Sequence, residues 1–258
     1  MFLTDPKTRK KDILAAAGFL AVMVFVGIAA WTGWKYYKET PPYIDPARYP
    51  ISGIDVSRHQ GMMNLDATVA AGFDFIFIKA SEGESYKDPN FRLNYDKATH
   101  AGLKAGAYHF FRFDIDGITQ ARNLMEAVGN RPLDLGVAID VEEHGNARGV
   151  DMETIQFRLI SMVEYLNLKG LRPIIYTNAR GYVDFVENTL PGCVLWICGF
   201  TDPPIAAEWT IWQYNHRGEV PGIKGPVDLN VFNGDRSQWE TFLLEQHYDP
   251  EEHSKSRI

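Results

Sequence analysis

The chain has 258 residues, of which 45% are hydrophobic and 23% are charged; this excludes a disordered chain, a collagen-like chain and a small disulfide-stabilised fold. The charge is unevenly distributed, because residues 1–44 carry a net charge of +3 and the remainder carries −10. An acidic body repels phosphate backbones, so we expect no nucleic-acid partner.

An apolar segment near the N-terminus covers residues 13–34 and contains no charged residue. A helix of this length crosses about 30 Å of hydrocarbon. Four basic residues precede it, and Trp31 and Trp34 lie at its far end, so the positive-inside rule predicts a cytoplasmic N-terminus at 1–12 and a membrane anchor at 13–34. A signal peptide cleaved near 27–29 is the alternative, and both interpretations place the body outside the cytoplasm, tethered or secreted.

Three further segments complete the predicted organisation. Residues 35–50 contain four prolines and little periodicity, which is typical of a short, stiff linker. Residues 51–246 form the predicted domain. Residues 247–258 are polar, and we expect a frayed tail.

Apolar runs and helical patterns alternate along the domain. Strands are expected at 51–57, 74–80, 105–111, 135–142 and 172–178, and helices at 64–71, 90–103, 117–129, 151–169 and 180–189. Three more strands are expected at 193–199, 208–214 and 226–231, with loops between them. The fold class is therefore α/β. Alternating units predict a parallel sheet, and eight strands favour a modified, TIM-like β/α barrel with about five helices in an incomplete ring. A doubly wound open sheet is the alternative, but no G-x-G-x-x-G follows the first strand.

Carboxylates lie at the ends of three predicted strands. In the fourth expected strand, 135–142, the bulky residues alternate with a set that includes Asp140 and Glu142, so both acids should point into the barrel at its C-terminal mouth. The same alternation places Asp55 inward on the first strand and Asp228 on one face of the last. Each acid alone is equally well explained as a solvated loop residue or a helix cap. Four acids at one mouth instead predict an active site.

Clustered carboxylates repel one another, so at least one should have a raised pKa. A carboxyl that stays protonated near neutral pH can donate a proton, while an ionised neighbour stabilises developing positive charge. Cleavage of a glycosidic bond uses such a pair.

Other side chains suited to binding hydroxyl, amide and sugar groups are projected toward the same mouth. For His109 the alternative is a hydrogen-bonded core histidine, and for the aromatic residues it is core packing. Cys193 and Cys198 lie on opposite faces of one predicted strand, so we expect neither a disulfide between them nor a metal site. The candidate binding residues are Lys79, Tyr108, His109, Tyr176, Asn178, Trp196 and Gln213.

Eight motifs in this order resemble glycoside hydrolase family 25, the Chalaropsis-type lysozymes or N-acetylmuramidases. The resemblance extends from about Gly53 to Gly234, nearly the whole predicted domain. It includes GIDVSRHQG at 53–61, FIKASEG at 77–83, AIDVEEHG at 138–145, PIIYTN at 173–178, IWQYN at 211–215 and VDLNVFN at 227–233.

The resemblance implies an eight-stranded modified β/α barrel. It also implies that the enzyme binds the glycan strand of peptidoglycan and hydrolyses the β-1,4 bond between N-acetylmuramic acid and N-acetylglucosamine. It implies Glu142 as general acid with Asp140 as its partner, and Asp55 and Asp228 as the other two acids of the site. The nucleophile stays open between Asp140, Asp55 and the substrate's own N-acetyl group, of which we favour the last. No metal or organic cofactor is implied.

Two departures and two alternatives accompany this resemblance. Met63-Asn64-Leu65 replaces a frequent I-D-W segment, and Cys198 stands where a small alanine is common. The alternatives are a non-catalytic glycan-binding barrel and a hydrolase of another N-acetylated glycan. A non-catalytic relative would be expected to lack an acid, and all four are present.

Overall fold

The computed structural model describes residues 18–32, 41–201 and 208–251 and divides the chain into two compact units, 1–41 and 42–258. In the first unit, residues 18–32 are helical and expose their apolar side chains. No helix within the described ranges is both long and apolar enough to cross a membrane. The membrane anchor predicted at 13–34 is therefore not supported, although residues 13–17 and 33–34 of that segment lie outside the described residues, as do 1–12.

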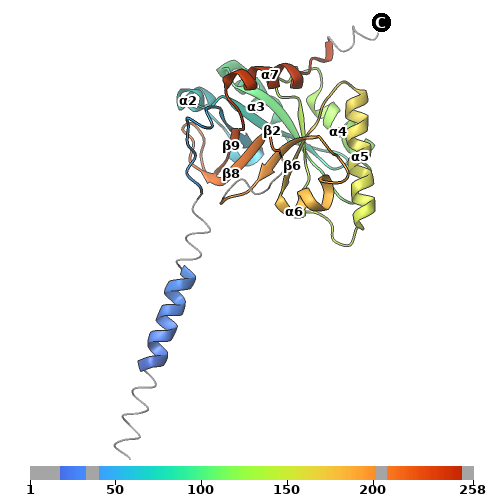
Figure 1. The fold of residues 1–258 in the computed structure, drawn as a ribbon. Coiled ribbons are helices and arrows are strands. Elements are labelled where there is room, and N and C mark those ends of the chain that lie inside the picture. Colours follow the sequence, from blue (N-terminus) through green and yellow to red (C-terminus); the bar gives the residue numbers. More distant parts are fainter. Residues whose placement is uncertain (1–17, 33–40, 202–207, 252–258) are drawn as a thin grey trace, which may run out of the picture. The chain divides into compact units, whose positions relative to one another are not determined.

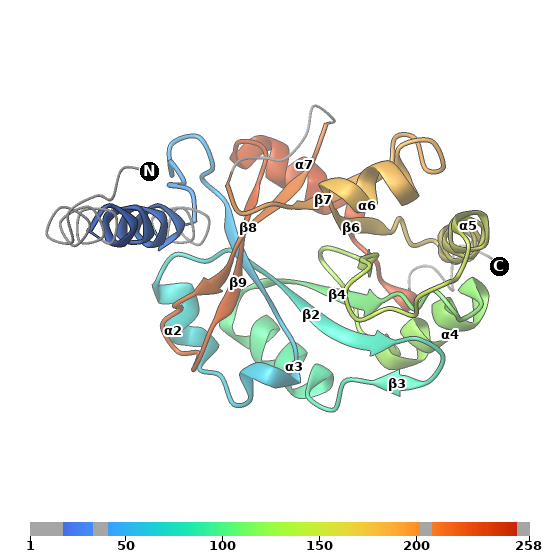
Figure 2. The ribbon, with the colours of Figure 1, turned by 90° about the horizontal axis from the view of Figure 1, so that it is seen from below.

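The second unit is a closed barrel of eight strands (Figures 1 and 2). The sheet closes because β1 pairs with β2 on one side and with β9 on the other. A short strand, β3, pairs with the end of β2 and stands outside the ring. The eight barrel strands are β1 (Ser52–Val56), β2 (Phe75–Glu82), β4 (Lys104–Phe110), β5 (Val137–Asp140), β6 (Ile174–Asn178), β7 (Val194–Cys198), β8 (Ile211–Gly218) and β9 (Val227–Phe232), with β3 at Tyr86–Lys87.

The closed barrel confirms the expected architecture over the open doubly wound sheet, with one correction. The pairs from β1 through β2 and β4 to β8 are parallel, but β9 runs antiparallel to both β8 and β1. The all-parallel sheet predicted from the sequence is therefore wrong for β9. Residues 219–226 between β8 and β9 are too few for a crossover helix, so β9 returns beside β8 in the opposite direction.

Helices follow the strands in the order expected from the sequence, and most lie around the outside of the barrel (Figure 2). Asp116 and Asp151 cap the two longest of them by accepting hydrogen bonds from the backbone N–H of Thr119 and Thr154. The helical elements are η1 (Arg58–Gln60), α2 (Leu65–Ala70), α3 (Phe91–Ala101), α4 (Gly117–Val128), α5 (Met152–Leu168), α6 (Ala179–Gly181) with the π-helical turn η2 (Tyr182–Val186), and α7 (Arg236–Gln246).

Helix α7 was not among the expected helices, and it closes the end of the barrel opposite the mouth. Its Trp239 packs on Phe75 at the start of β2 and on Phe232 at the end of β9, with ring centroids 5.2 and 5.1 Å apart. The helix has no clear apolar stripe in the sequence. Its detectable signal was the capping box of Asp235 and Gln238.

The ends of the domain also differ from expectation. Tyr248 is buried and exchanges two backbone hydrogen bonds with Leu133, so the tail predicted to fray from 247 is anchored at this residue. On the N-terminal side, Tyr49 packs against the rings of Trp209 and Trp212, so the end of the predicted linker contributes to the barrel.

The core forms two layers separated by the barrel wall. Val137 and Ile139 of β5 belong to the outer layer beneath the helices, whereas Ala138 belongs to the inner layer. Leu135, expected in the outer layer, packs in the inner one because Gly136 adopts φ +60° and interrupts the alternation. From Val137 onward the alternation holds, and it directs Asp140 toward the mouth.

Candidate active site

The four acids predicted from strand ends line one cleft of about 730 Å³ at the mouth of the barrel. Asp140 ends β5, and Glu142 follows it two residues later. Asp55 of β1 stands directly opposite Asp228 of β9 in the ladder. Because β9 is antiparallel, its first residues, and not its last, lie at the mouth.

Asp55 is held by two amide side chains. Its Oδ2 accepts hydrogen bonds from Gln213 Nε2 at 2.8 Å and Asn230 Nδ2 at 2.9 Å. Burial raises the pKa of Asp55 to about 6, and the hydrogen bonds from Asn230, Gln213 and Asp228 oppose that rise. Asp55 is therefore ionised at neutral pH.

Asp228 is the protonated member of the pair with Asp55. Burial, the charge of Asp55 and the hydrogen bond between the two carboxyls raise the pKa of Asp228 to about 8. At neutral pH Asp228 thus keeps its proton and donates it to the Asp55 carboxylate, so that two adjacent acids carry about one negative charge.

Asp140 and Glu142 form the second pair. Burial, followed by the charge of Glu142, raises the pKa of Asp140 well above its usual range. Burial also raises the pKa of Glu142, and the nearby His144 acts in the opposite direction. The Oδ1 atom of Asp140 is buried and has no hydrogen-bond partner among the described residues. The arrangement supplies a proton donor and an unused acceptor side by side.

Aromatic side chains form a wall of the cleft. Trp196 and Tyr176 meet edge to face with ring centroids 4.8 Å apart. Their polar atoms are occupied, because Tyr176 donates to Gln213 Oε1 at 2.9 Å and Trp196 Nε1 donates to Asn230 Oδ1 at 2.8 Å. The rings are thereby fixed next to the hydrogen-bond network of Asp55, and Tyr108 lines the same cleft.

Lys79 and Asn178, two further predicted binding residues, also line the cleft. Lys79 Nζ forms an ion pair with Glu82 Oε2 at 2.7 Å. Asn178 Oδ1 accepts hydrogen bonds from the backbone N–H of Arg180 and Gly181 and so caps α6. Lys79 therefore brings a positive charge to the cleft that contains the four acids.

The structure corrects the assignment of His109 to the binding residues. This side chain is fully buried on the outer face of β4, where Nδ1 lies 2.8 Å from Ser81 Oγ and Nε2 lies 3.1 Å from Gln120 Oε1 of α4. Burial lowers the pKa of His109 to about 4. Successive residues of a strand point to opposite faces, so Tyr108 and His109 cannot both face the cleft, and the core-histidine alternative is correct.

Several residues of the cleft were missed. Phe110 shares the inward face of β4 with Tyr108, and strand alternation was the signal that would have identified it. His144 lies two residues beyond Glu142, and Phe200 and His216 come from different segments with ring centroids 4.3 Å apart. These last two meet because β7, which Phe200 follows, pairs with β8, which carries His216.

Among the described residues there is no group of three or more His, Cys, Asp or Glu side chains that could hold a metal ion. Cys193 and Cys198 are free thiols, and burial raises their pKa values to about 11 and about 12. A thiol with so high a pKa is a poor nucleophile at neutral pH.

Comparison with known proteins agrees with this geometry. Residues 54–223 match the family model described as glycosyl hydrolases family 25. Protein YegX of Escherichia coli is 34% identical over 206 residues, covering 77% of this chain and 75% of YegX. Lysozyme M1 of Streptomyces globisporus is 34% identical over 207 residues, covering 71% of this chain and 68% of that enzyme.

A solved structure gives the same result for the fold. The family 25 glycosyl hydrolase from Bacillus anthracis superimposes with a TM-score of 0.72 at 31% sequence identity, covering 78% of this chain and 96% of that one. The family model covers well over half of the chain, and it includes the segments that carry Asp55, Asp140 and Glu142. The chain belongs to glycosyl hydrolase family 25.

Proposed function

We propose that this chain is an N-acetylmuramidase, which hydrolyses the β-1,4 bond from N-acetylmuramic acid to N-acetylglucosamine in peptidoglycan. The observation that carries the proposal is the pair of Asp140 and Glu142 at the end of β5, both with raised pKa values in a cleft with an aromatic wall. Lysozymes among the relatives support the substrate class.

In the proposed first step, Glu142 donates its proton to the glycosidic oxygen as the C–O bond breaks. The carbonyl oxygen of the substrate's N-acetyl group attacks C1 and forms a cyclic oxazolinium, so the sugar never exists as a free cation. In the second step Glu142, now ionised, takes a proton from water, and the water oxygen opens the ring at C1. The net reaction consumes one water and leaves Glu142 protonated again.

Asp140 orients the attacking group in this proposal. Its Oδ1 lacks a partner among the described residues, and the N–H of an acetamido group supplies one. Burial raises the pKa values of both Asp140 and Glu142, so in the empty cleft it favours the protonated form of each carboxyl. A hydrogen bond from the substrate favours the ionised form of Asp140, and the proton then resides on Glu142, where the first step needs it.

The test is the variant Glu142→Gln, assayed on purified peptidoglycan. We expect turnover to fall by about 10²- to 10⁴-fold, with the Tm and glycan binding retained. Glu143→Gln is the matched control, because this neighbouring acid pairs at 3.4 Å with the exposed Arg180 and does not line the cleft. Full activity of Glu142→Gln would refute the assignment of the general acid.

Mass spectrometry of the products tests the substrate. A muramidase leaves N-acetylmuramic acid at the new reducing end. N-acetylglucosamine at that position would instead identify a hydrolase of another linkage, and no cleavage at all would favour a glycan-binding barrel. Detection of a covalent glycosyl adduct on Asp55 or Asp140 would show that this carboxylate, and not the N-acetyl group, is the nucleophile.

We also propose that the barrel acts outside the cytoplasm, because peptidoglycan lies there and four basic residues precede the apolar segment at 13–34. Cell fractionation with external protease tests this location. The mass of the mature chain shows whether the apolar segment is retained or removed.

A further inference from the structure

Glu82, the last residue of β2, lies beside the cleft without lining it. Its carboxylate contacts two cations: Oε2 lies 2.7 Å from Lys79 Nζ, and Oε1 lies 3.6 Å from Arg112 Nη1. All three side chains are partly shielded from water, with 31%, 17% and 30% of their surfaces exposed, respectively. Lys79 reaches this carboxylate from the same strand, β2, and Arg112 reaches it from the segment that follows β4.

The first cation, Lys79, acts on the catalytic pair. It lines the cleft, and its charge favours the ionised forms of Asp140 and Glu142, which lowers their pKa values. The buried Oδ1 of Asp140 has no partner among the described residues and would attract a free ammonium group. The ion pair with Glu82 holds the lysine elsewhere, with Nζ 5.0 Å from the centre of the Phe110 ring.

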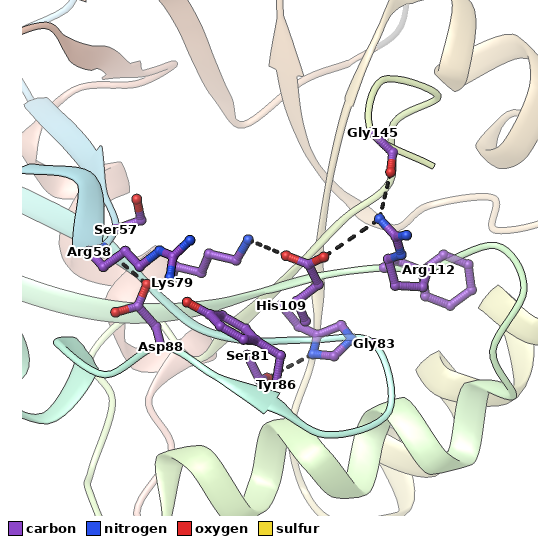
Figure 3. A network of polar contacts seen from close by, with 12 residues as sticks. Ser57, Arg58, Lys79, Ser81, Gly83, Tyr86, Asp88, His109, Arg112 and Gly145 are labelled. Atoms are coloured by element: carbon purple, nitrogen blue, oxygen red, sulfur yellow. Dashed lines mark hydrogen bonds and ion pairs between the residues drawn. The ribbon is translucent and has the colours of Figure 1, made fainter. Parts of the chain in front are cut away.

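The second cation, Arg112, reaches the loop that follows Glu142. Its Nη1 donates a hydrogen bond of 2.5 Å to the carbonyl oxygen of Gly145 (Figure 3). Gly145 is three residues beyond Glu142, and this contact joins the loop to the end of β4. Glu82 therefore links a charge inside the cleft to the backbone that carries the general acid.

We propose that Glu82 is a positioning residue, which holds Lys79 away from Asp140 and, through Arg112, fixes the loop after Glu142. This inference rests on the proposed function where it concerns turnover. Its effect on the carboxyls of the cleft requires no substrate.

The charged groups around the pair determine the direction of the effect. Asp55 of β1 raises the pKa values of both Asp140 and Glu142, and Asp228 of β9 raises that of Asp140. Lys79 lowers the pKa values of both carboxyls, and His144 lowers that of Glu142. Glu82 itself faces Lys79, Arg112, the Tyr86 ring and the buried His109 of β4. Removing the charge of Glu82 leaves Lys79 unneutralised, so the pKa values of both catalytic carboxyls should fall.

The experiment is a carbon-13 NMR titration of the Asp140 and Glu142 carboxyls in the full-length chain. We expect Glu82→Gln to move their titration down by about one pH unit and Lys79→Met to move it up. In the double variant, which combines Glu82→Gln with Lys79→Met, the titration should match that of Lys79→Met alone, because Glu82 affects the carboxyls by neutralising Lys79. The charge-conserving Glu82→Asp should stay close to the unaltered protein.

Turnover gives an independent measure. In Glu82→Gln the alkaline limb of the kcat profile should move to lower pH in step with the titration, with KM changed less than kcat. Glu126→Gln is the matched control, because it breaks an ion pair of similar length, 2.8 Å to Lys87, with side chains that are 69% and 46% exposed. It should leave both the titration and the profile unchanged.

An unshifted titration in a folded Glu82→Gln variant would overturn the inference, and so would a shift that persists in the Lys79→Met background. If Glu82→Gln does not fold, the absence of an upward shift in Lys79→Met overturns it equally. A shifted titration in a chain that cleaves no peptidoglycan would leave the positioning role intact and refute the proposed function instead.

Discussion

At the scale of single residues, the two carboxyl pairs of the cleft differ in the hydrogen bonds that they receive from the protein. Asp55 receives hydrogen bonds from Gln213 and Asn230 and stays ionised near neutral pH. Asp140 has a buried oxygen without a partner among the described residues. A carboxylate whose oxygens already accept hydrogen bonds stabilises positive charge on a substrate. A carboxyl oxygen without a partner can instead accept a hydrogen bond from the substrate, so we propose that Asp140 makes the substrate contact.

A prediction at this scale concerns Asp228, whose pKa is about 8 in the folded chain against an ordinary 3.8. A raised pKa stabilises the fold fully below the ordinary value, and that contribution is lost as the pH rises toward 8. Asp228→Asn removes this titration, so its Tm should decline less than that of the unaltered protein between pH 4 and 8. Calorimetry across this pH range measures it. The exposed Asp114→Asn serves as control, and an equally steep decline in Asp228→Asn would contradict the assignment.

At the scale of elements, one amide side chain makes three hydrogen bonds in the loop after β5, in addition to the contact of Arg112 with Gly145. Asn146 Nδ2 donates to the carbonyl oxygens of Glu142 at 2.8 Å and Phe111 at 2.9 Å, and its Oδ1 accepts from the N–H of Phe113 at 2.8 Å. These contacts tie Glu142, the proposed general acid, to the segment following β4. The strand directs Asp140, but the loop positions Glu142.

We therefore expect Asn146→Ala to lower kcat by about 10- to 100-fold, because a displacement of about 1 Å at a reacting group has an effect of this size, while KM changes little. Steady-state kinetics on soluble peptidoglycan fragments measures the two constants. Asn188→Ala, at an exposed turn, is the control and should behave as the unaltered protein. Unchanged kcat in Asn146→Ala would show that the loop keeps its place without this side chain.

At the scale of the whole molecule, the candidate active site lies at one end of the barrel, and a packed aromatic cluster lies at the other. The mouth gathers acids, and the opposite end is sealed by α7, where Trp239 packs among Phe75, Phe232 and Phe242. Stability and catalysis are thus assigned to opposite ends of the same strands, as in other β/α barrels.

We expect Trp239→Ala to reduce the free energy of unfolding by about 3 to 5 kcal/mol, the usual cost of removing a buried aromatic side chain, while turnover below the Tm is retained. Urea unfolding and activity assays measure the two quantities. Leu244→Ala on the same helix is the control, because that side chain is 82% exposed, and it should cost less than about 0.5 kcal/mol. Loss of activity at full stability would contradict this division.

Strand and helix periodicity in the sequence determines most of the architecture. The strand–helix units after β1, the inward direction of Asp140 and the eight-stranded barrel all follow from local alternation, which depends on side chains a few residues apart. Helix α7 was missed because its packing, and not its pattern, determines its orientation.

The tertiary structure decided what depends on distant segments. The alternation of β4 was present in the sequence, but only the packing of α4 showed that His109 is satisfied by Gln120 on the outer face. Likewise, a run of apolar residues gives no strand direction, so the antiparallel course of β9, which brings Asp228 to Asp55, had to come from the closed sheet. Periodicity specifies which face a residue occupies, whereas its partner on that face comes from another element: a helix 11 residues along the chain for His109 and Gln120, and the last strand of the closed sheet for Asp55.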